Sequence, residues 1–166
     1  MTSTLNLARI AAVVAIFGFF LPWAEVSCSG APLVHETGIQ LITGGADTAA
    51  PGHHDLWVAA ALGLIVLGLA GGLLMRGRSA AMILMATALA AGIASLIGAA
   101  QEVPNASAQA QIVAGSSSDA SAQAAGALIH AQLEYGYFVT LGGLIAAIGA
   151  AGLALAGQRS PNGGSG

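Results

Sequence analysis

Four apolar stretches alternate with polar, turn-rich sequence along the chain. They cover residues 5–22, 56–75, 79–100 and 135–156. A membrane-spanning helix needs about 20 predominantly apolar residues to cross roughly 30 Å of hydrocarbon. The pattern therefore predicts an all-α membrane protein, a bundle of four transmembrane helices that forms one domain over residues 1–157. The glycine-rich residues 158–166 are predicted to form a flexible tail.

The charges give this bundle an orientation. The basic residues lie near the amino terminus, in the link between the second and third stretches, or after the fourth: Arg9, Arg76, Arg78 and Arg159. The acids and histidines lie in the long loops 23–55 and 101–134 or at their edges. The positive-inside rule then places both termini in the cytoplasm. With the bias toward alanine and arginine, we expect a multi-pass protein of a bacterial inner membrane, its long loops on the periplasmic or extracellular side.

Residues suited to the membrane interface flank the apolar stretches. The aromatic residues near the outer side are expected to form an interfacial belt: Trp23, Trp57, Tyr135 and Tyr137. Arg76 and Arg78 fall on the inner side, where we expect them to contact lipid headgroups.

The outer loops carry signals of local structure. Residues 26–28 and 33–37 flank the turn-forming sequence 29–32 and predict a small β-hairpin. Residues 38–42 predict a further short extended or single-turn piece near the membrane surface. In the second loop, Ser118 and Asp119 are suited to cap a helix that runs to Gln132 and either continues into the fourth span or breaks at Gly136. A continuous helix over 119–156 would be about 57 Å long.

Small residues recur at helical spacing in the predicted spans. They are Gly68, Gly72, Ala88, Gly92, Gly142, Ala146 and Ala150. Because lipid removes the hydrophobic drive between helices, membrane helices associate through close backbone approach at such positions. We interpret each stripe as packing inside the bundle in preference to an oligomer face, although several stripes leave surface for neighbouring subunits.

Composition excludes some classes of function. The 166 residues are 56% hydrophobic and 7% charged, and the basic residues are all arginine. Nucleic-acid binding needs clustered positive charge, so a nucleic-acid partner is not expected. The second to fourth spans contain only Thr87, Ser95 and Thr140 as polar side chains, and such hydroxyls usually bond back to their own helix. A path for charged solutes through one subunit is therefore not predicted.

The first loop holds the strongest chemical cluster in the sequence: His35, His53, His54 and Asp55. Imidazole and carboxylate groups suit zinc or copper. The competing interpretation, which we favour, makes the histidines interfacial and Asp55 the cap of the second span. His130 could ligate a haem or pigment. No cofactor is predicted for the chain alone; a pigment, haem or metal would come from a larger assembly.

Cys28 is the single cysteine, so it forms no intramolecular disulfide. The first apolar stretch could be read as a signal that places Cys28 at a lipidation site. Glu25 stands where such a signal wants an aliphatic residue, so we expect an uncleaved helix. Cys28 lacks a basic neighbour in sequence, which favours a buried structural thiol over a modified or reactive one.

Three short motifs carry a resemblance. The order Leu21-Pro22-Trp23, Val26-Ser27-Cys28 and Thr37-Gly38-Ile39-Gln40-Leu41 resembles small bacterial four-span proteins of unassigned function. The layout of four spans with a β-rich first outer loop is more distantly similar to that of the claudins, which have a second loop cysteine that is missing here. The resemblance implies topology and no activity.

The sequence thus predicts a non-enzymatic structural or accessory subunit of a larger membrane assembly. Its partners would be the lipid bilayer and other membrane subunits or further copies of this chain, bound through small-residue helix faces and the outer loops. The alternative is a metal-binding or small-solute transport protein that uses the histidines of the first outer loop.

Overall fold

The computed structural model describes residues 2–28, 31–44, 54–115 and 129–157. In this part of the chain, long helices carry most of the fold. They are α1 (Thr2–Gly18), α3 (Leu56–Leu74), α4 (Arg78–Gly115) and α6 (Tyr135–Ala156). Three apolar helical segments are long enough to cross a membrane, at 19, 24 and 22 residues in α3, α4 and α6. These segments indicate a multi-pass membrane protein.

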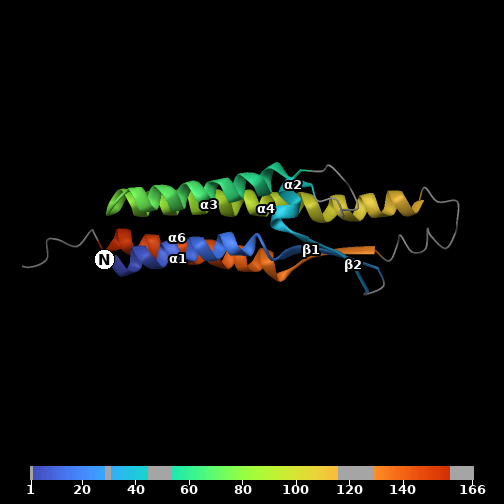
Figure 1. Ribbon diagram of the computed structural model, residues 1–166, viewed down its shortest axis with the longest axis horizontal. Helices are drawn as coiled ribbons and strands as arrows, with labels where there is room; N and C mark the ends of the chain where they lie inside the picture. The colour runs from blue at the N-terminus through green and yellow to red at the C-terminus, as the bar shows by residue number, and fades with distance from the viewer. Residues whose placement is uncertain (1, 29–30, 45–53, 116–128, 158–166) are drawn as a thin grey trace, which may run out of the picture.

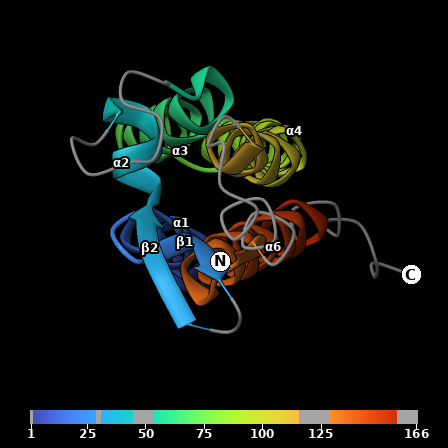
Figure 2. The ribbon, with the colours of Figure 1, turned by 90° about the vertical axis from the view of Figure 1, so that its right-hand side faces the viewer.

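The helices form two layers (Figures 1 and 2). The α3–α4 hairpin lies over the pair formed by α1 and α6. The start of α1, the α3–α4 turn and the end of α6 lie at one end of the bundle, which we call the arginine end because Arg76 and Arg78 belong to that turn. The strands lie at the opposite end, the sheet end, where α4 projects beyond the other helices.

Helix α1 ends earlier than the hydrophobic pattern predicts, at Gly18 instead of residue 22. The backbone amides of Phe19, Phe20 and Leu21 bond to carbonyls three residues back, in a tight turn. Pro22 then begins a strand. The predicted boundary was wrong because residues 19–21 are as apolar as the helix, so hydrophobicity alone does not register the turn.

The sheet is antiparallel, with the strand order β2-β1-β3. The predicted hairpin is confirmed as β1 (Pro22–Cys28) and β2 (Ala31–Thr37). The piece after it is a short helix, α2 (Gly38–Thr43), which begins with a capping box between Thr37 and Gln40. The third strand, β3 (Ile129–Leu133), pairs with the other edge of β1.

The prediction of a helix that leads into the fourth span is wrong for residues 129–134, the part of it before α6 that the structure describes. Residues 129–133 form β3, and α6 begins at Tyr135, so no continuous helix runs from 119 to 156. Backbone pairing with β1 outweighs the helical propensity of this alanine-rich sequence. Residues 119–128 lie outside the described part of the chain. The helical projection belongs instead to α4, which continues past Ala100 to Gly115 and is about 57 Å long.

Helices α1 and α6 approach at backbone distance. A Cβ added at Gly143 would lie 2.8 Å from the Ala15 nitrogen and 2.9 Å from the Ala11 carbonyl oxygen. One turn earlier, Thr140 is fully buried and lies against Gly18 of α1. The small residues of α1 and Gly143 of α6 therefore form the closest seam between these two helices.

The α3–α4 hairpin uses glycines in the same way. Gly68 lies against Thr87, and a Cβ at Gly72 would lie 2.8 Å from the Leu84 side chain. Ala88 and Ala150 are also buried.

Other residues of the predicted stripes do not pack inside the bundle. Added Cβ atoms at Gly92 and Gly142 would meet nothing within 4 Å, and Ala146 is exposed. The interior position expected for these residues is wrong, because a stripe of strict four-residue spacing drifts around a helix that has 3.6 residues per turn.

Arg9 ties the two layers together near the arginine end. Its Nε donates to the carbonyl oxygen of Gly72 at 3.1 Å, and its Nη2 donates to the same oxygen. Gly72 lies in the last turn of α3, where helix carbonyls lack intrahelical partners and the helix dipole favours a cation. Arg9 therefore stabilises the end of α3 from the neighbouring helix.

We predict opposite outcomes for alanine at two adjacent glycines of α6. Gly143→Ala should lower the free energy of unfolding by about 1–3 kcal/mol, because the new methyl group meets backbone atoms of α1 that cannot rotate away. Gly142→Ala is the matched control and should be neutral or stabilising, since its methyl group meets nothing within 4 Å. Thermal unfolding in mild detergent measures both, and equal unfolding temperatures for the two variants would contradict this packing.

Candidate functional site

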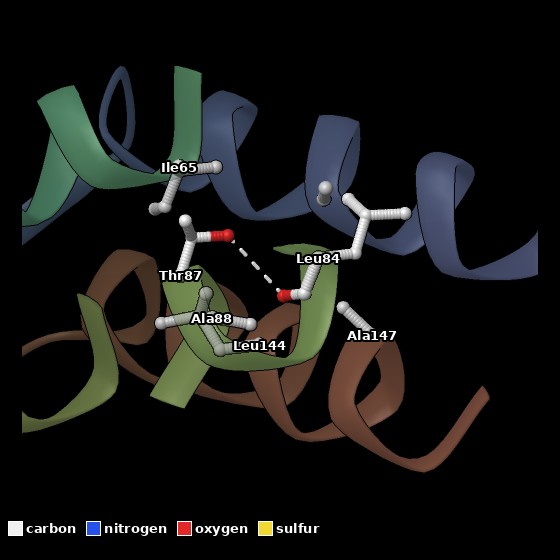
Figure 3. Close-up of a pocket in the computed structure, with 7 residues that line it drawn as sticks. Ile65, Leu84, Thr87, Ala88, Leu144 and Ala147 are labelled. Carbon is white, nitrogen blue, oxygen red and sulfur yellow. Dashed lines mark hydrogen bonds between the residues drawn. The ribbon is translucent and has the colours of Figure 1, made fainter. Parts of the chain in front are cut away.

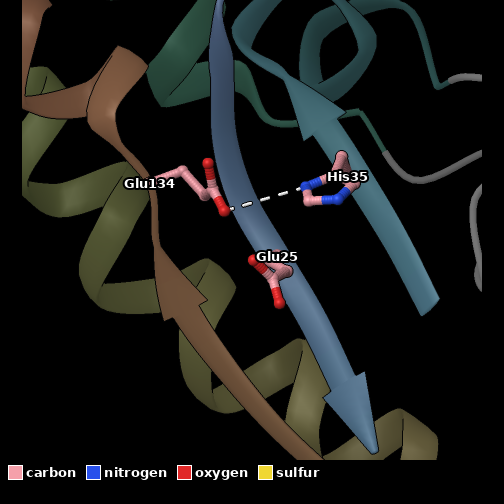
Figure 4. Close-up of side chains that lie close together, drawn as sticks. All are labelled: Glu25, His35 and Glu134. Atoms are coloured by element: carbon pink, nitrogen blue, oxygen red, sulfur yellow. Dashed lines mark ion pairs between the residues drawn. The ribbon is translucent and has the colours of Figure 1, made fainter. Parts of the chain in front are cut away.

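Three ionisable side chains converge on one face of the sheet: Glu25, His35 and Glu134 (Figure 4). Glu25 belongs to the central strand β1, and His35 lies directly opposite it on β2. Gln132 of β3 lies opposite Glu25 on the other side, so Glu134, two residues later, faces the same way as Glu25. The antiparallel pairing therefore places all three side chains together.

The ligand atoms of this cluster are close to one another. One nitrogen of His35 and one carboxylate oxygen from each glutamate all lie within 4.8 Å of one another. His35 Nδ1 lies 3.7 Å from Glu134 Oε1, an ion-pair distance that is longer than a hydrogen bond. The His35 side chain is half exposed, whereas that of Glu134 is mostly covered. The cluster is thus accessible from solvent on its histidine side.

The Glu25 side chain changes the pKa of Glu134. Hydrogen bonding between the Glu134 and Glu25 side chains raises the pKa of Glu134 because it favours the protonated form of Glu134; burial and the charge of Glu25 act in the same direction, and the charge of His35 opposes them. The negative charges of two carboxylates this close to each other repel. The site therefore favours a positive charge placed between them, whether a proton or a cation.

The backbone of Glu134 is fixed where β3 passes into α6. Its amide donates to the Trp23 carbonyl oxygen at 2.8 Å. Glu134 occupies the N-cap position of α6, yet its side chain makes no capping hydrogen bond. The carboxylate instead points toward Glu25 and His35 (Figure 4).

Trp23 joins the sheet to the bundle. Its side chain is 2% exposed, and its indole Nε1 donates to the Gly18 carbonyl oxygen at the end of α1, at 2.9 Å. The ring packs against Phe19 at 4.6 Å and Tyr137 at 5.5 Å between centroids. Trp23 and Tyr137 therefore lie inside the protein and not in an exposed aromatic belt. Trp57 and Tyr135 are exposed at the sheet end.

The structure does not assemble the histidine cluster that the sequence suggested. His54 is exposed, and its Nδ1 lies 3.0 Å from the Ile42 carbonyl oxygen. Asp55 accepts from the Trp57 and Val58 amides at the start of α3, which confirms its role as a helix cap. His35 joins Glu25 and Glu134 instead, and His53 lies outside the described residues.

His130 and Cys28 lie on paired strands. His130 is opposite Ser27, and Cys28 is opposite Ile129. We expected His130, as a haem or pigment ligand, to lie on a helix. The structure places it on strand β3 instead. The side chains of His130 and Cys28 lie outside the described part of the structure.

The cavity that the structure describes between the long helices is too small for a ligand. A cavity of about 10 Å³ lies between the four long helices, at or below the size of one water molecule (Figure 3). Its single polar lining residue, Thr87, bonds back to the Ile83 carbonyl oxygen at 2.8 Å. Thr140 bonds back to Gly136 at 3.0 Å in the same way. The prediction that the span hydroxyls bond back to their own helices is confirmed for Thr87 and Thr140 and is wrong for Ser95, whose buried hydroxyl has no hydrogen-bond partner among the described residues.

Comparison with protein-family models, with curated protein sequences and with solved structures finds no match to this chain. The resemblance to small four-span proteins and to the claudin layout therefore stays a prediction.

The sequence did not reveal the Glu25, His35 and Glu134 cluster. Symmetrical pairing around the predicted turn 29–32 would place Glu25 opposite Glu36, whereas the structure pairs Glu25 with His35 because the register shifts between Val26 and Ser27. Glu134 gave no signal either, because its position depends on the long-range pairing of β3 with β1.

We predict that Trp23→Phe lowers the free energy of unfolding by about 1–3 kcal/mol, because it removes a buried hydrogen bond at the end of α1. Trp57→Phe is the matched control: Trp57 is 43% exposed, and its replacement should have little effect. Chemical unfolding in mild detergent, followed by circular dichroism, measures the difference. Equal losses in both variants would contradict a special role for Trp23.

Proposed function

We propose that this chain is a non-enzymatic structural or accessory subunit of a larger assembly in a bacterial inner membrane. In this proposal α1 is a fourth span, both termini are cytoplasmic, and the sheet end faces the periplasm or the extracellular side. The following paragraphs give the observations that support it.

The length and surface of α1 support its assignment as a span. Its 17 residues correspond to about 26 Å, close to the hydrocarbon thickness, and the turn after it adds further apolar length. Ile10, Phe17 and Phe20 are each about 60% exposed, which suits contact with lipid. Arg76 and Arg78 lie together at one end of the bundle, as the positive-inside rule requires of this topology, and Glu25 and Glu134 lie at the other end.

The main support for an assembly is the outward face of α6. Gly142 and Gly149 both face open space, and the exposed Ala146 lies between them. Residues at spacings of four and seven share one side of a helix, so these three small residues form a strip beside the exposed Ile145 that no part of the described chain covers. We call it the α6 strip. Strips of this kind allow a second helix to approach closely in lipid.

The bundle interior supports a binding role over transport. Thr87 and Thr140 bond to their own helices, and the cavity among the four long helices is smaller than a solute. A transporter would need polar groups that face a path through the spans. The surface of the bundle is therefore the part best suited to function, and the α6 strip is its most specific feature.

We predict that wild-type protein in mild detergent or lipid nanodiscs forms an assembly larger than a monomer, with itself or with a co-purifying membrane subunit. The double variant Gly142→Leu/Gly149→Leu should weaken that association by at least about tenfold, because bulky side chains prevent close helix approach. Native mass spectrometry and light scattering after size exclusion measure the mass.

Gly63→Leu is the matched control for the α6 double variant. Gly63 also faces open space, but on α3, so its replacement should leave the α6 contact intact. A wild-type protein that is monomeric with no co-purifying chain would contradict the proposal, as would equal dissociation by the α3 and α6 variants.

A further inference from the structure

We propose that Glu25, His35 and Glu134 bind one divalent transition-metal ion of the zinc type at the sheet end, and that the ion links β2, β1 and the start of α6. The proposal goes beyond the structural role above and does not depend on it. The next paragraphs give its geometry and chemistry.

The spacing of the ligand atoms suits one ion. In a tetrahedral zinc site with nitrogen and oxygen ligands, bonds of about 2.0–2.1 Å place the ligand atoms roughly 3.4 Å apart. The three candidate atoms here all lie within 4.8 Å of one another before any ion draws them in. Figure 4 shows the three side chains on one face of the sheet, with Glu134 directed toward His35 and Glu25 on the strand between them, so an ion would have to draw the ligand atoms together by about 1 Å.

The scaffold holds the ligands in register. Glu25 and His35 are direct cross-strand partners, whose Cβ atoms lie about 5 Å apart in an antiparallel pair. The Glu134 amide is tied to the Trp23 carbonyl oxygen, and Trp23 is locked into the bundle through Gly18. Each ligand therefore stands on hydrogen-bonded backbone, which is what a metal site needs in order to bind without reordering the chain.

The Glu134 carboxylate is not occupied by its own helix. The preferred N-cap residues are Asp, Asn, Ser and Thr, and glutamate is not among them. Asp55 accepts from the first-turn amides of α3, whereas Glu134 makes no such bond at the start of α6. The Glu134 carboxylate instead faces Glu25 and His35, where a cation relieves the repulsion between the two carboxylates.

The ligand types select the class of ion. Ca²⁺ and Mg²⁺ prefer all-oxygen sites, whereas imidazole suits zinc and its first-row neighbours. Two carboxylates and one neutral imidazole also balance the charge of a divalent ion. Three protein ligands leave a fourth position for water or for a group from a partner.

Calorimetric titration of chelator-stripped protein with Zn²⁺ tests the proposal. The wild type should bind one ion per chain, and Glu25→Gln and His35→Gln should each raise the dissociation constant by at least about tenfold. Glu36→Gln and His54→Gln are the matched controls. Glu36 follows His35 on β2 and so points to the other face of the sheet, and His54 lies outside the cluster. The controls should leave the dissociation constant unchanged.

Two further measurements separate a metal ligand from a structural residue. The metal-free Glu25→Gln protein should unfold at the wild-type temperature or above it, because the change removes repulsion, while Zn²⁺ should no longer raise that temperature. Co²⁺ added to the wild type should give ligand-field absorption bands that shift in His35→Gln. The same titrations in a Cys28→Ser background exclude a contribution from the thiol.

Three results would overturn the proposal. The wild type could show no saturable Zn²⁺ binding, His35→Gln could bind as tightly as His54→Gln, or Ca²⁺ could bind as tightly as Zn²⁺. The last result would make the site an all-oxygen cation site without a role for the histidine.

Discussion

The backbones of α1 and α6 meet at Gly143, where no side chain separates the two helices. In lipid there is no hydrophobic gain from burying one apolar helix against another, so such close approach supplies most of the attraction. The contact also places the end of α1 beside the start of α6, because Gly136 lies against the Leu21 and Pro22 backbone. The position of the sheet on the bundle follows from this contact.

Trp23 fixes the position of the strands relative to α1 and α6. Its indole holds the last turn of α1, its ring packs on Tyr137 of α6, and its carbonyl oxygen holds the Glu134 amide. β1 therefore leaves the bundle in a fixed direction, and β2 and β3 pair on its two edges. Glu25 and Glu134 meet because both chain segments are anchored within a few residues of this tryptophan.

The sequence predicted the long helices, the turn at Arg76–Arg78, the hairpin and the Asp55 cap, because each depends on local pattern. It did not predict β3 or the projection of α4, since backbone pairing and packing over long sequence distances decide them. Small-residue stripes predicted that helices pack closely but not which face packs: Gly143 touches α1, and its neighbour Gly142 faces outward. His35 was named as a candidate ligand, while its partners required the sheet register.

Single-cysteine labelling in intact cells tests the central claim, that α1 crosses the membrane and the two ends of the bundle lie on opposite sides. In a Cys28→Ser background, Thr43→Cys and Gln132→Cys place exposed thiols at the sheet end, and Ser3→Cys and Ser79→Cys place them at the arginine end. A membrane-impermeant maleimide should label the first pair in intact cells and the second pair only after permeabilisation. Labelling of Ser3→Cys from outside at the level of Gln132→Cys would contradict the account.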